Sequence, residues 1–310
     1  MNELKPSTQQ KLFGLDKYFL QLTKLYKDNL YPNKLLISGQ KGIGKSTLAY
    51  HFINYVLSED EVHKYDIHNF EINYESTTFK TILNKSNINL ITIDISSDKK
   101  VVDVNQIRDL IVNLNKSSFN NKPRFVLIDN IELLNTNSIN ALLKVVEEPN
   151  QNIHFILINN NKKILPTLLS RCINYKVSLT NKESLVIANH LLGMQLDSLI
   201  NKDLVNYYFT PGNIYYLVKF AEQYKYNLPD LDLKKFLRII IKENHYKKDP
   251  FMRYMVFQLI EFYFRKLNFS FSKKIDEKYS YFLRRISDTK TFNLDEESLF
   301  MEFEDEVLNG

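Results

Sequence analysis

The stretch Gly39-Gln40-Lys41-Gly42-Ile43-Gly44-Lys45-Ser46 decides the fold, because it fits the pattern G-x-x-x-x-G-K-[ST] with no mismatch. The flanking residues predict a strand over 34–38 and an amphipathic helix over 45–57. In that setting the glycines let backbone N–H groups turn toward phosphate oxygens, and the helix N-terminus adds partial positive charge. Lys45 would reach the β and γ phosphates, and the Ser46 hydroxyl would hold Mg²⁺. The pattern predicts a nucleoside triphosphate site; the alternative is a glycine-rich turn without a ligand.

A carboxylate for the Mg²⁺ ion is predicted at the end of a second strand. Residues 125–128 are Phe-Val-Leu-Ile and are followed by Asp129. A run of four apolar residues is typical of a parallel strand buried on both faces, and it brings the aspartate to the carboxyl edge of the sheet, beside the phosphate loop. The alternative is that Asp129 only caps the next helix.

Two further polar residues border predicted strands. Asn159 ends the strand predicted over 155–159, where an amide could orient a water or contact the γ phosphate. The alternative is a simple loop start, because residues 159–161 are all asparagine. Arg171 precedes the strand predicted over 172–177, where a guanidinium could reach a neighbouring subunit and stabilise charge on a transferred phosphoryl group. A surface arginine is the alternative for that position.

Residues 12–177 alternate short apolar runs with amphipathic stretches, which predicts strand–helix units and a parallel α/β sheet. Residues 59–87 are rich in charge and asparagine, and we expect an irregular insertion there. After residue 177 the pattern becomes helical: three short helices are expected over 180–221, and amphipathic helices over 231–308 with an acidic stretch at 295–306. The predicted strands are 35–38, 90–95, 125–129, 155–159 and 172–177, and the predicted helices between them are 12–30, 45–57, 104–115 and 139–147.

Composition excludes several classes of protein. With 310 residues, 44% of them hydrophobic and 25% charged, the chain is a folded protein of two or three domains. The single cysteine, Cys172, excludes an internal disulfide framework and a cysteine-rich zinc module, favours a reducing cytosol, and is expected to be a buried small hydrophobe. No apolar run of 18 residues is present, the polar opening predicts no secretory signal, and the six histidines show no metal-ligand spacing. The net charge of +5 is only weakly suggestive of nucleic acid.

Taken in order, the motifs resemble a known family. The sequence GQKGIGKS, then FVLIDN, then NALLKVVEEP over 140–149, then LPTLLSRC over 165–172 is similar to the AAA+ core of the sliding-clamp loaders. Within this group, residues 32–39, 41–49 and the VNQIR segment at 104–108 most resemble the delta-prime subunits of bacterial DNA polymerase III. Distinct motifs cover roughly residues 10–222, and the C-terminal helices match only by type.

The resemblance implies a fold of three parts: an α/β AAA+ P-loop domain with a five-stranded parallel sheet over 1–177, a helical lid over 178–225, and an all-helical C-terminal collar over 226–310. It also implies a cytoplasmic pentameric ring with gamma/tau and delta subunits, which opens the beta sliding clamp and places it on primed DNA. ATP with Mg²⁺ is the expected ligand, without zinc. The residues that match the family's nucleotide site are Gly39, Gln40, Lys41, Gly42, Ile43, Gly44, Lys45, Ser46 and Thr47, with Asp129 as the Mg²⁺ carboxylate, Asn159 at the sensor-1 position and Arg171 as the arginine finger acting on a neighbour's ATP.

The sequence departs from the family's motor subunits at two positions that bear on hydrolysis. Asn130 stands where hydrolysing relatives carry the glutamate that polarises the attacking water, and an amide cannot act as a base. Tyr215 stands where their lid motif carries a sensor-2 arginine. The phosphate loop is intact, so we expect a subunit that binds ATP with little or no hydrolysis of its own.

Two other functions compete with this interpretation. A gamma/tau-like motor subunit would need Glu132 or Lys219 to replace the missing groups. A stand-alone DNA-binding AAA+ protein is suggested only by the lysines and arginines that lie among aromatic residues over 234–285. We favour a helical bundle with a basic solvated face as the interpretation of that segment.

Overall fold

A five-stranded parallel sheet with the strand order β2-β3-β4-β1-β5 organises the first part of the chain, as predicted. The computed structural model describes residues 4–93, 104–114, 120–147, 152–205, 209–267, 273–292 and 294–309. All five predicted strands are present with ends shifted by at most two residues where the chain is described; residues 94 and 95 lie outside the described part. The strands are β1 (Lys34–Ser38), β2 (Leu90–Ile93), β3 (Arg124–Ile128), β4 (Ile153–Asn159) and β5 (Ile173–Lys176).

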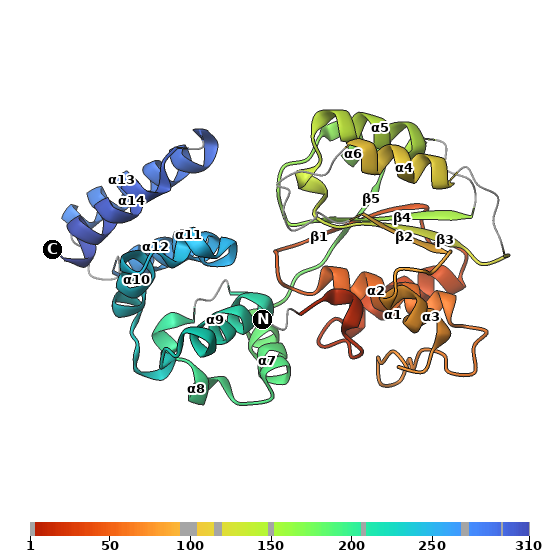
Figure 1. The fold of residues 1–310 in the computed structure, drawn as a ribbon, viewed down its shortest axis with the longest axis horizontal. Helices are drawn as coiled ribbons and strands as arrows, with labels where there is room; N and C mark the ends of the chain where they lie inside the picture. Colours follow the sequence, from red (N-terminus) through yellow and green to blue (C-terminus); the bar gives the residue numbers. More distant parts are fainter. Residues whose placement is uncertain are drawn as a thin grey trace. The chain divides into compact units, whose positions relative to one another are not determined.

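Helices cover both faces of this sheet, which explains why the central strands β1, β3 and β4 are apolar on both sides. In Figure 1, α1, α2 and α3 lie on one face, and α4, α5 and α6 lie on the other. The strand β1 shows the division: Leu35 and Ile37 pack into the core beneath α1 and α2, and Leu36 packs into the core beneath α4 and α5. The helices are α1 (Asp16–Lys27), α2 (Lys45–Leu57), α3 (Thr77–Leu83), α4 (Val104–Leu114), α5 (Thr136–Glu147) and α6 (Pro166–Leu169), with 3-10 turns at Pro6–Thr8 and Ile131–Leu133.

The expectation of an irregular insertion over 59–87 is wrong in part. The helix α3 lies within it and begins at Ser76, whose hydroxyl accepts from the backbone N–H of Phe79 at 3.2 Å. Phe79 and Ile82 are buried in the same core as α1 and α2, together with Tyr65 and Ile72. These few apolar side chains, dispersed among polar ones, anchor the segment to the domain.

The strand predicted over 172–177 is present as β5, but the expectation that Cys172 begins a core strand is wrong, because β5 lies at the edge of the sheet. Ile173 is 61% exposed, and only Tyr175 within the strand is partly buried. Cys172 precedes the strand and is partly buried against the core beneath α4 and α5. Burial raises the pKa of its thiol to about 11, so the thiolate is disfavoured at neutral pH.

The described residues of the second part of the chain form helices only, as the sequence predicts. Contacts divide the chain into two compact units, Met1–Ile187 and Ala188–Gly310, and the predicted lid and collar boundaries stay predictions. Thr210 accepts from the N–H of Asn213 and Pro211 opens the next helix, which confirms the predicted helix start. The helices are α7 (Asn181–Leu192), which contains the boundary, then α8 (Leu196–Leu199), α9 (Pro211–Tyr224), α10 (Leu233–Lys242), α11 (His245–Lys248), α12 (Pro250–Leu267), α13 (Lys273–Phe292) and α14 (Glu296–Phe303), with short turns at Lys202–Leu204, Leu228–Asp230 and Glu304–Leu308.

The acidic C-terminal stretch pairs with basic residues of this helical unit. Lys247 lies 2.6 Å from Glu297, Arg253 pairs with Glu296, and Arg285 lies 3.1 Å from Glu302. These three cations belong to the basic segment 234–285, so part of its charge is matched within the chain. A search of the described helices finds none that is long and apolar enough to cross a membrane.

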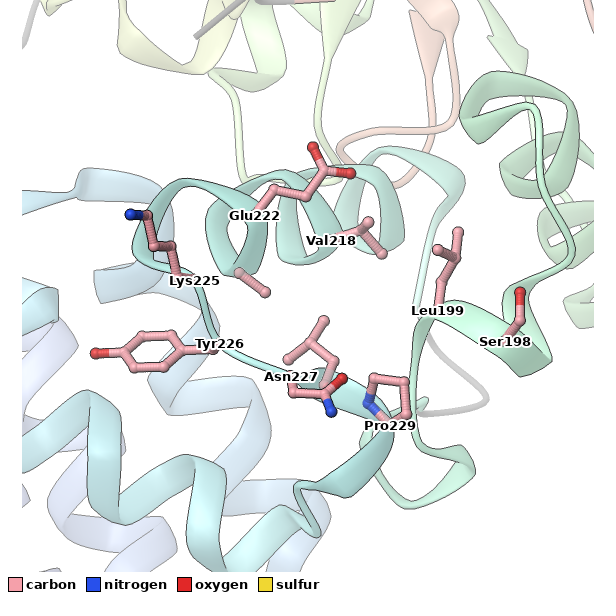
Figure 2. A pocket seen from close by; sticks show the side chains of 10 residues that line it. Ser198, Leu199, Val218, Glu222, Lys225, Tyr226, Asn227 and Pro229 are labelled. Carbon is pink, nitrogen blue, oxygen red and sulfur yellow. The ribbon is translucent and has the colours of Figure 1, made fainter.

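A shallow pocket of about 370 Å³ opens in the helical unit between α9 and the segment 226–229 (Figure 2). Val218 and Leu199 contribute apolar surface, and the other lining residues include both polar and apolar side chains. Its one acidic residue, Glu222, pairs with Lys219 at 2.7 Å, so we assign no ligand to this pocket.

Candidate nucleotide-binding site

Three loops meet at the carboxyl edge of the sheet because the strands that carry them run parallel. Ser38, the last residue of β1, is in register with Asn159 of β4, and Ile128 of β3 is in register with Leu157. The phosphate loop, Asp129 and the asparagines after β4 therefore emerge side by side. This convergence is the one predicted from the sequence, and the described structure brings the residues into hydrogen-bond contact.

The loop backbone adopts conformations that require glycine. Gly42 and Gly44 have φ angles of +86° and +92°, in the region that disfavours residues with a side chain. Gly39 has no room for a side chain: a Cβ placed on it would lie 2.4 Å from the carbonyl oxygen of Val177. Gly44 also caps α2, and its carbonyl accepts from the N–H of Leu48 at 2.9 Å. These three glycines thus shape a loop that leads directly into a helix N-terminus.

Lys45 is a buried cation without a carboxylate among its hydrogen-bond acceptors. Its side chain is only 3% exposed, and its Nζ donates to the carbonyls of Gly39 (2.9 Å) and Gln40 (2.6 Å) and to the Oδ1 of Asn160 (2.9 Å). Burial lowers the pKa of Lys45 to about 8, and the charges of Asp129 and Glu132 only partly oppose that shift. A buried ammonium group held by neutral oxygens is suited to receiving an anion.

Ser46 and Asp129 form the second pair of the site. The Ser46 hydroxyl, on the first turn of α2, donates to the Asp129 Oδ2 at 2.5 Å. The other carboxylate oxygen accepts from the N–H of Asn130 at 2.8 Å. A hydroxyl and a carboxylate are oxygen ligands that Mg²⁺ prefers, and P-loop proteins use this pair for it. The following 3-10 turn takes Asn130 as its cap residue, so the alternative of Asp129 as a helix cap is not what the structure shows.

The asparagines after β4 divide into two roles. The Asn159 amide donates to the carbonyl of Lys162 at 3.0 Å, and its Oδ1 accepts from the Lys162 N–H at 3.1 Å. Asn159 therefore stabilises its own turn, and its contact with nucleotide stays a prediction. Asn160, which the sequence did not single out, contacts Lys45. Three consecutive asparagines gave no signal of which one would face the phosphate loop.

Asn160 also joins Lys45 to the loop after β3. Its Nδ2 donates to the Oδ1 of Asn130 at 2.7 Å and to the Oε1 of Glu132 at 2.8 Å, and its backbone N–H donates to the other Glu132 oxygen at 3.3 Å. Asn130 has a φ of +53°, a conformation that asparagine tolerates better than most residues. The site therefore contains a carboxylate, Glu132, whose two oxygens both accept from Asn160.

Arg171 lies at the corner between α6 and β5. Its Nη1 donates to the carbonyl of Thr167 at 2.9 Å. The neighbouring Leu169 and Ile173 are 43% and 61% exposed. An arginine beside exposed apolar residues is typical of protein–protein contacts, and the action of Arg171 on a neighbour's nucleotide stays a prediction.

Two residues named in connection with the missing sensor-2 arginine, Tyr215 and Lys219, lie on α9 of the helical unit. Tyr215 is buried on α9, with 8% of its surface exposed, and Lys219 one turn later pairs with Glu222 at 2.7 Å. Lys219, named as a replacement for the sensor arginine, thus already has an acidic partner on its own helix.

Comparison with known proteins places the chain in a family. The family model described as "DNA polymerase III, delta subunit" matches residues 14–181. The tau/gamma subunit of DNA polymerase III from Haemophilus influenzae is 30% identical over 188 residues, which cover 60% of this chain and 26% of the relative. The delta' subunit from Buchnera aphidicola is 29% identical over 174 residues, 51% of this chain and 50% of the relative. The chain thus matches half or less of the length of these relatives. A gamma subunit-related protein from Thermotoga maritima aligns over 91% of this chain and 96% of its own, with 17% identity and a TM-score of 0.45.

Proposed function

The chain belongs to the family of DNA polymerase III delta subunits, and we propose that it is a delta-prime-like subunit of the clamp loader. In this proposal it joins gamma/tau and delta subunits in a cytoplasmic ring that loads the beta sliding clamp onto primed DNA. It binds ATP with Mg²⁺, hydrolyses little or none of it, and supplies Arg171 to the ATP of a neighbouring gamma/tau subunit.

The observation that carries nucleotide binding is the buried Lys45, whose hydrogen-bond acceptors are all neutral. Phosphate oxygens would compensate its charge, and the N–H groups of the loop and α2 would add donors. Ser46 and Asp129 would hold Mg²⁺, which would neutralise charge on the β and γ phosphates. Lys45, Ser46 and Asp129 therefore fit MgATP.

Weak hydrolysis is supported by the residues around Asp129. Asn130 cannot take a proton from water, and its Oδ1 already accepts from Asn160. The alternative of a gamma/tau-like motor subunit is favoured by one observation, the presence of the Glu132 carboxylate in the site. Both Glu132 oxygens accept from Asn160, which fixes the orientation of the carboxylate, and we therefore prefer the delta-prime role.

Assembly is the experiment that tests the loader role. The purified chain, mixed with gamma/tau and delta subunits of the same organism, is expected to co-elute with them as one complex on size-exclusion chromatography. That complex is expected to place the beta clamp on primed circular DNA, and omission of this chain should abolish loading. A chain that elutes alone, and binds duplex DNA with a steep salt dependence, would instead favour the stand-alone DNA-binding alternative.

The pKa of Lys45 predicts how nucleotide affinity depends on pH. Below about pH 8 the ammonium is charged both with and without nucleotide, so affinity is constant. As pH rises through about 8 the free protein loses this proton, and binding must restore it, so affinity should fall by up to about tenfold per pH unit. Titration of a fluorescent ATP analogue from pH 7 to 9.5 measures this. A flat profile over that range would contradict it, and Lys80→Met, at an exposed lysine of α3, should retain the decline.

A further inference from the structure

The Asn160 side chain uses every polar atom it has to connect Lys45 with the loop after β3. Its Oδ1 accepts from the Lys45 ammonium, and its two Nδ2 hydrogens go to Asn130 and Glu132. An amide has one acceptor and two donors at these atoms, so the reversed orientation would place N–H groups against the ammonium and oxygen against two acceptors. The surrounding groups therefore fix the direction in which Asn160 points.

Lys45 cannot contact a phosphate without giving up one of its present acceptors. An ammonium group has three donors, and all three are in use. Two of the acceptors are carbonyls of Gly39 and Gln40, which belong to the loop backbone itself. Gly39 is further held by its N–H, which donates to the Asn159 carbonyl at 3.2 Å. The side chain of Asn160 is the acceptor that can be replaced without reshaping the loop.

We propose that Asn160 competes with phosphate for Lys45, and that it thereby sets the nucleotide affinity of this chain. The inference rests on the proposed function, since it assumes that nucleotide binds at the phosphate loop. Asn160 is a positioning residue: it acts on the ligand through Lys45. When phosphate takes the ammonium, the Oδ1 of Asn160 loses its donor, while its bonds to the loop after β3 remain.

Two substitutions test the competition in opposite directions. Asn160→Ala removes the competing acceptor, so MgATP should bind roughly 3- to 10-fold more tightly. Asn160→Asp places a carboxylate beside the ammonium and near the phosphates, so binding should weaken by about tenfold or more. Asn152→Ala, the same change at the exposed residue before the opposite end of β4, is the matched control and should leave affinity unchanged. Titration with a fluorescent ATP analogue and Mg²⁺ provides all four dissociation constants.

The pH profile separates competition from a merely structural role. The hydrogen bond from Lys45 to Asn160 favours the charged ammonium, so its loss in Asn160→Ala should lower the pKa of Lys45. Nucleotide affinity should then begin to fall at a lower pH than in the wild type. The charges that face Lys45 are Asp129, Glu132 and Lys41, and this variant changes none of them. A packing defect that admitted water to Lys45 would instead raise this midpoint, because burial is the main cause of its lowered pKa.

The outcomes distinguish the inference from the function on which it rests. Tighter binding by Asn160→Ala, weaker binding by Asn160→Asp and a lowered pH midpoint would support the competition. Nucleotide binding by the wild type that is unchanged or weakened in Asn160→Ala would overturn the inference and leave the site standing. Absence of nucleotide binding in the wild type would instead overturn the proposed function. If Asn160→Ala fails to fold, as judged by circular dichroism, unchanged affinity in Asn160→Asp overturns the competition.

Discussion

Replacing Arg171 with alanine is expected to lower ATP turnover by the assembled clamp loader by about 10³- to 10⁵-fold, without changing nucleotide binding by the isolated chain. Arg171 lies at the corner between α6 and β5, more than 120 residues after the phosphate loop of its own chain, and its guanidinium donates to the carbonyl of Thr167. A planar cation delivered from a neighbouring subunit stabilises charge on the transferred phosphoryl group. Multiple turnover of ATP by the reconstituted complex, with and without the substitution, measures the effect.

Two control variants distinguish the effect of the planar Arg171 guanidinium from the effect of positive charge alone and from the effect of removing an unrelated exposed arginine. Arg171→Lys keeps the positive charge but loses the planar fork, so it should recover only a small part of the rate. Arg108→Ala, at an exposed arginine on α4, should leave turnover unchanged. Full turnover by an assembled Arg171→Ala complex would refute the role in trans.

Replacing Lys45 with methionine is expected to weaken MgATP binding by the isolated chain by about 100-fold or more. Each hydrogen bond to a charged group contributes about 1.5–3 kcal/mol, and the ammonium would donate to both the β and γ phosphates. Methionine has a similar length and carries no charge into a site that is 3% exposed in the wild type. Removal of the ammonium relieves a buried charge but leaves three oxygens without their donor, so the free energy of unfolding should change little.

Calorimetric titration with MgATP gives the affinity, and chemical denaturation gives the free energy of unfolding. Lys80→Met, on the exposed face of α3, is the control and should bind nucleotide as the wild type does. If Lys45→Met binds MgATP normally while folded, the phosphate loop is not the nucleotide site, and the proposal for this edge of the sheet fails.

The central strands β1, β3 and β4 could be predicted from sequence because burial on both faces makes their apolar runs continuous. The strand β4 is buried at every residue from Ile153 to Asn159, and its pattern has no competing interpretation. The helix α3 escaped prediction because its buried residues, Phe79 and Ile82, stand among threonines and asparagines and cover only two turns. Its stability comes from packing against α2 and the turn at Pro6–Thr8, which a local pattern does not reveal.

The phosphate loop and Asp129 could be located from sequence because their motifs fix both residue type and spacing. The choice between Asn159 and Asn160 could not be made, because it depends on how the chain turns after β4. There the amide of Asn159 closes a turn onto Lys162, which directs Asn160 toward Lys45 and Glu132. Glu132 entered the sequence analysis only as a substitute base, and its contact with Asn160 required the structure.

The most direct test is ATP turnover by the isolated chain at saturating MgATP, measured beside the amount of nucleotide it holds. We expect the chain to retain bound ATP and to release phosphate no faster than Lys45→Met does, because Asn130 cannot act as a base and the Glu132 oxygens are held by Asn160. Sustained ATP turnover by the wild type that Lys45→Met abolishes would contradict a subunit that binds ATP without hydrolysing it. It would identify a motor subunit instead.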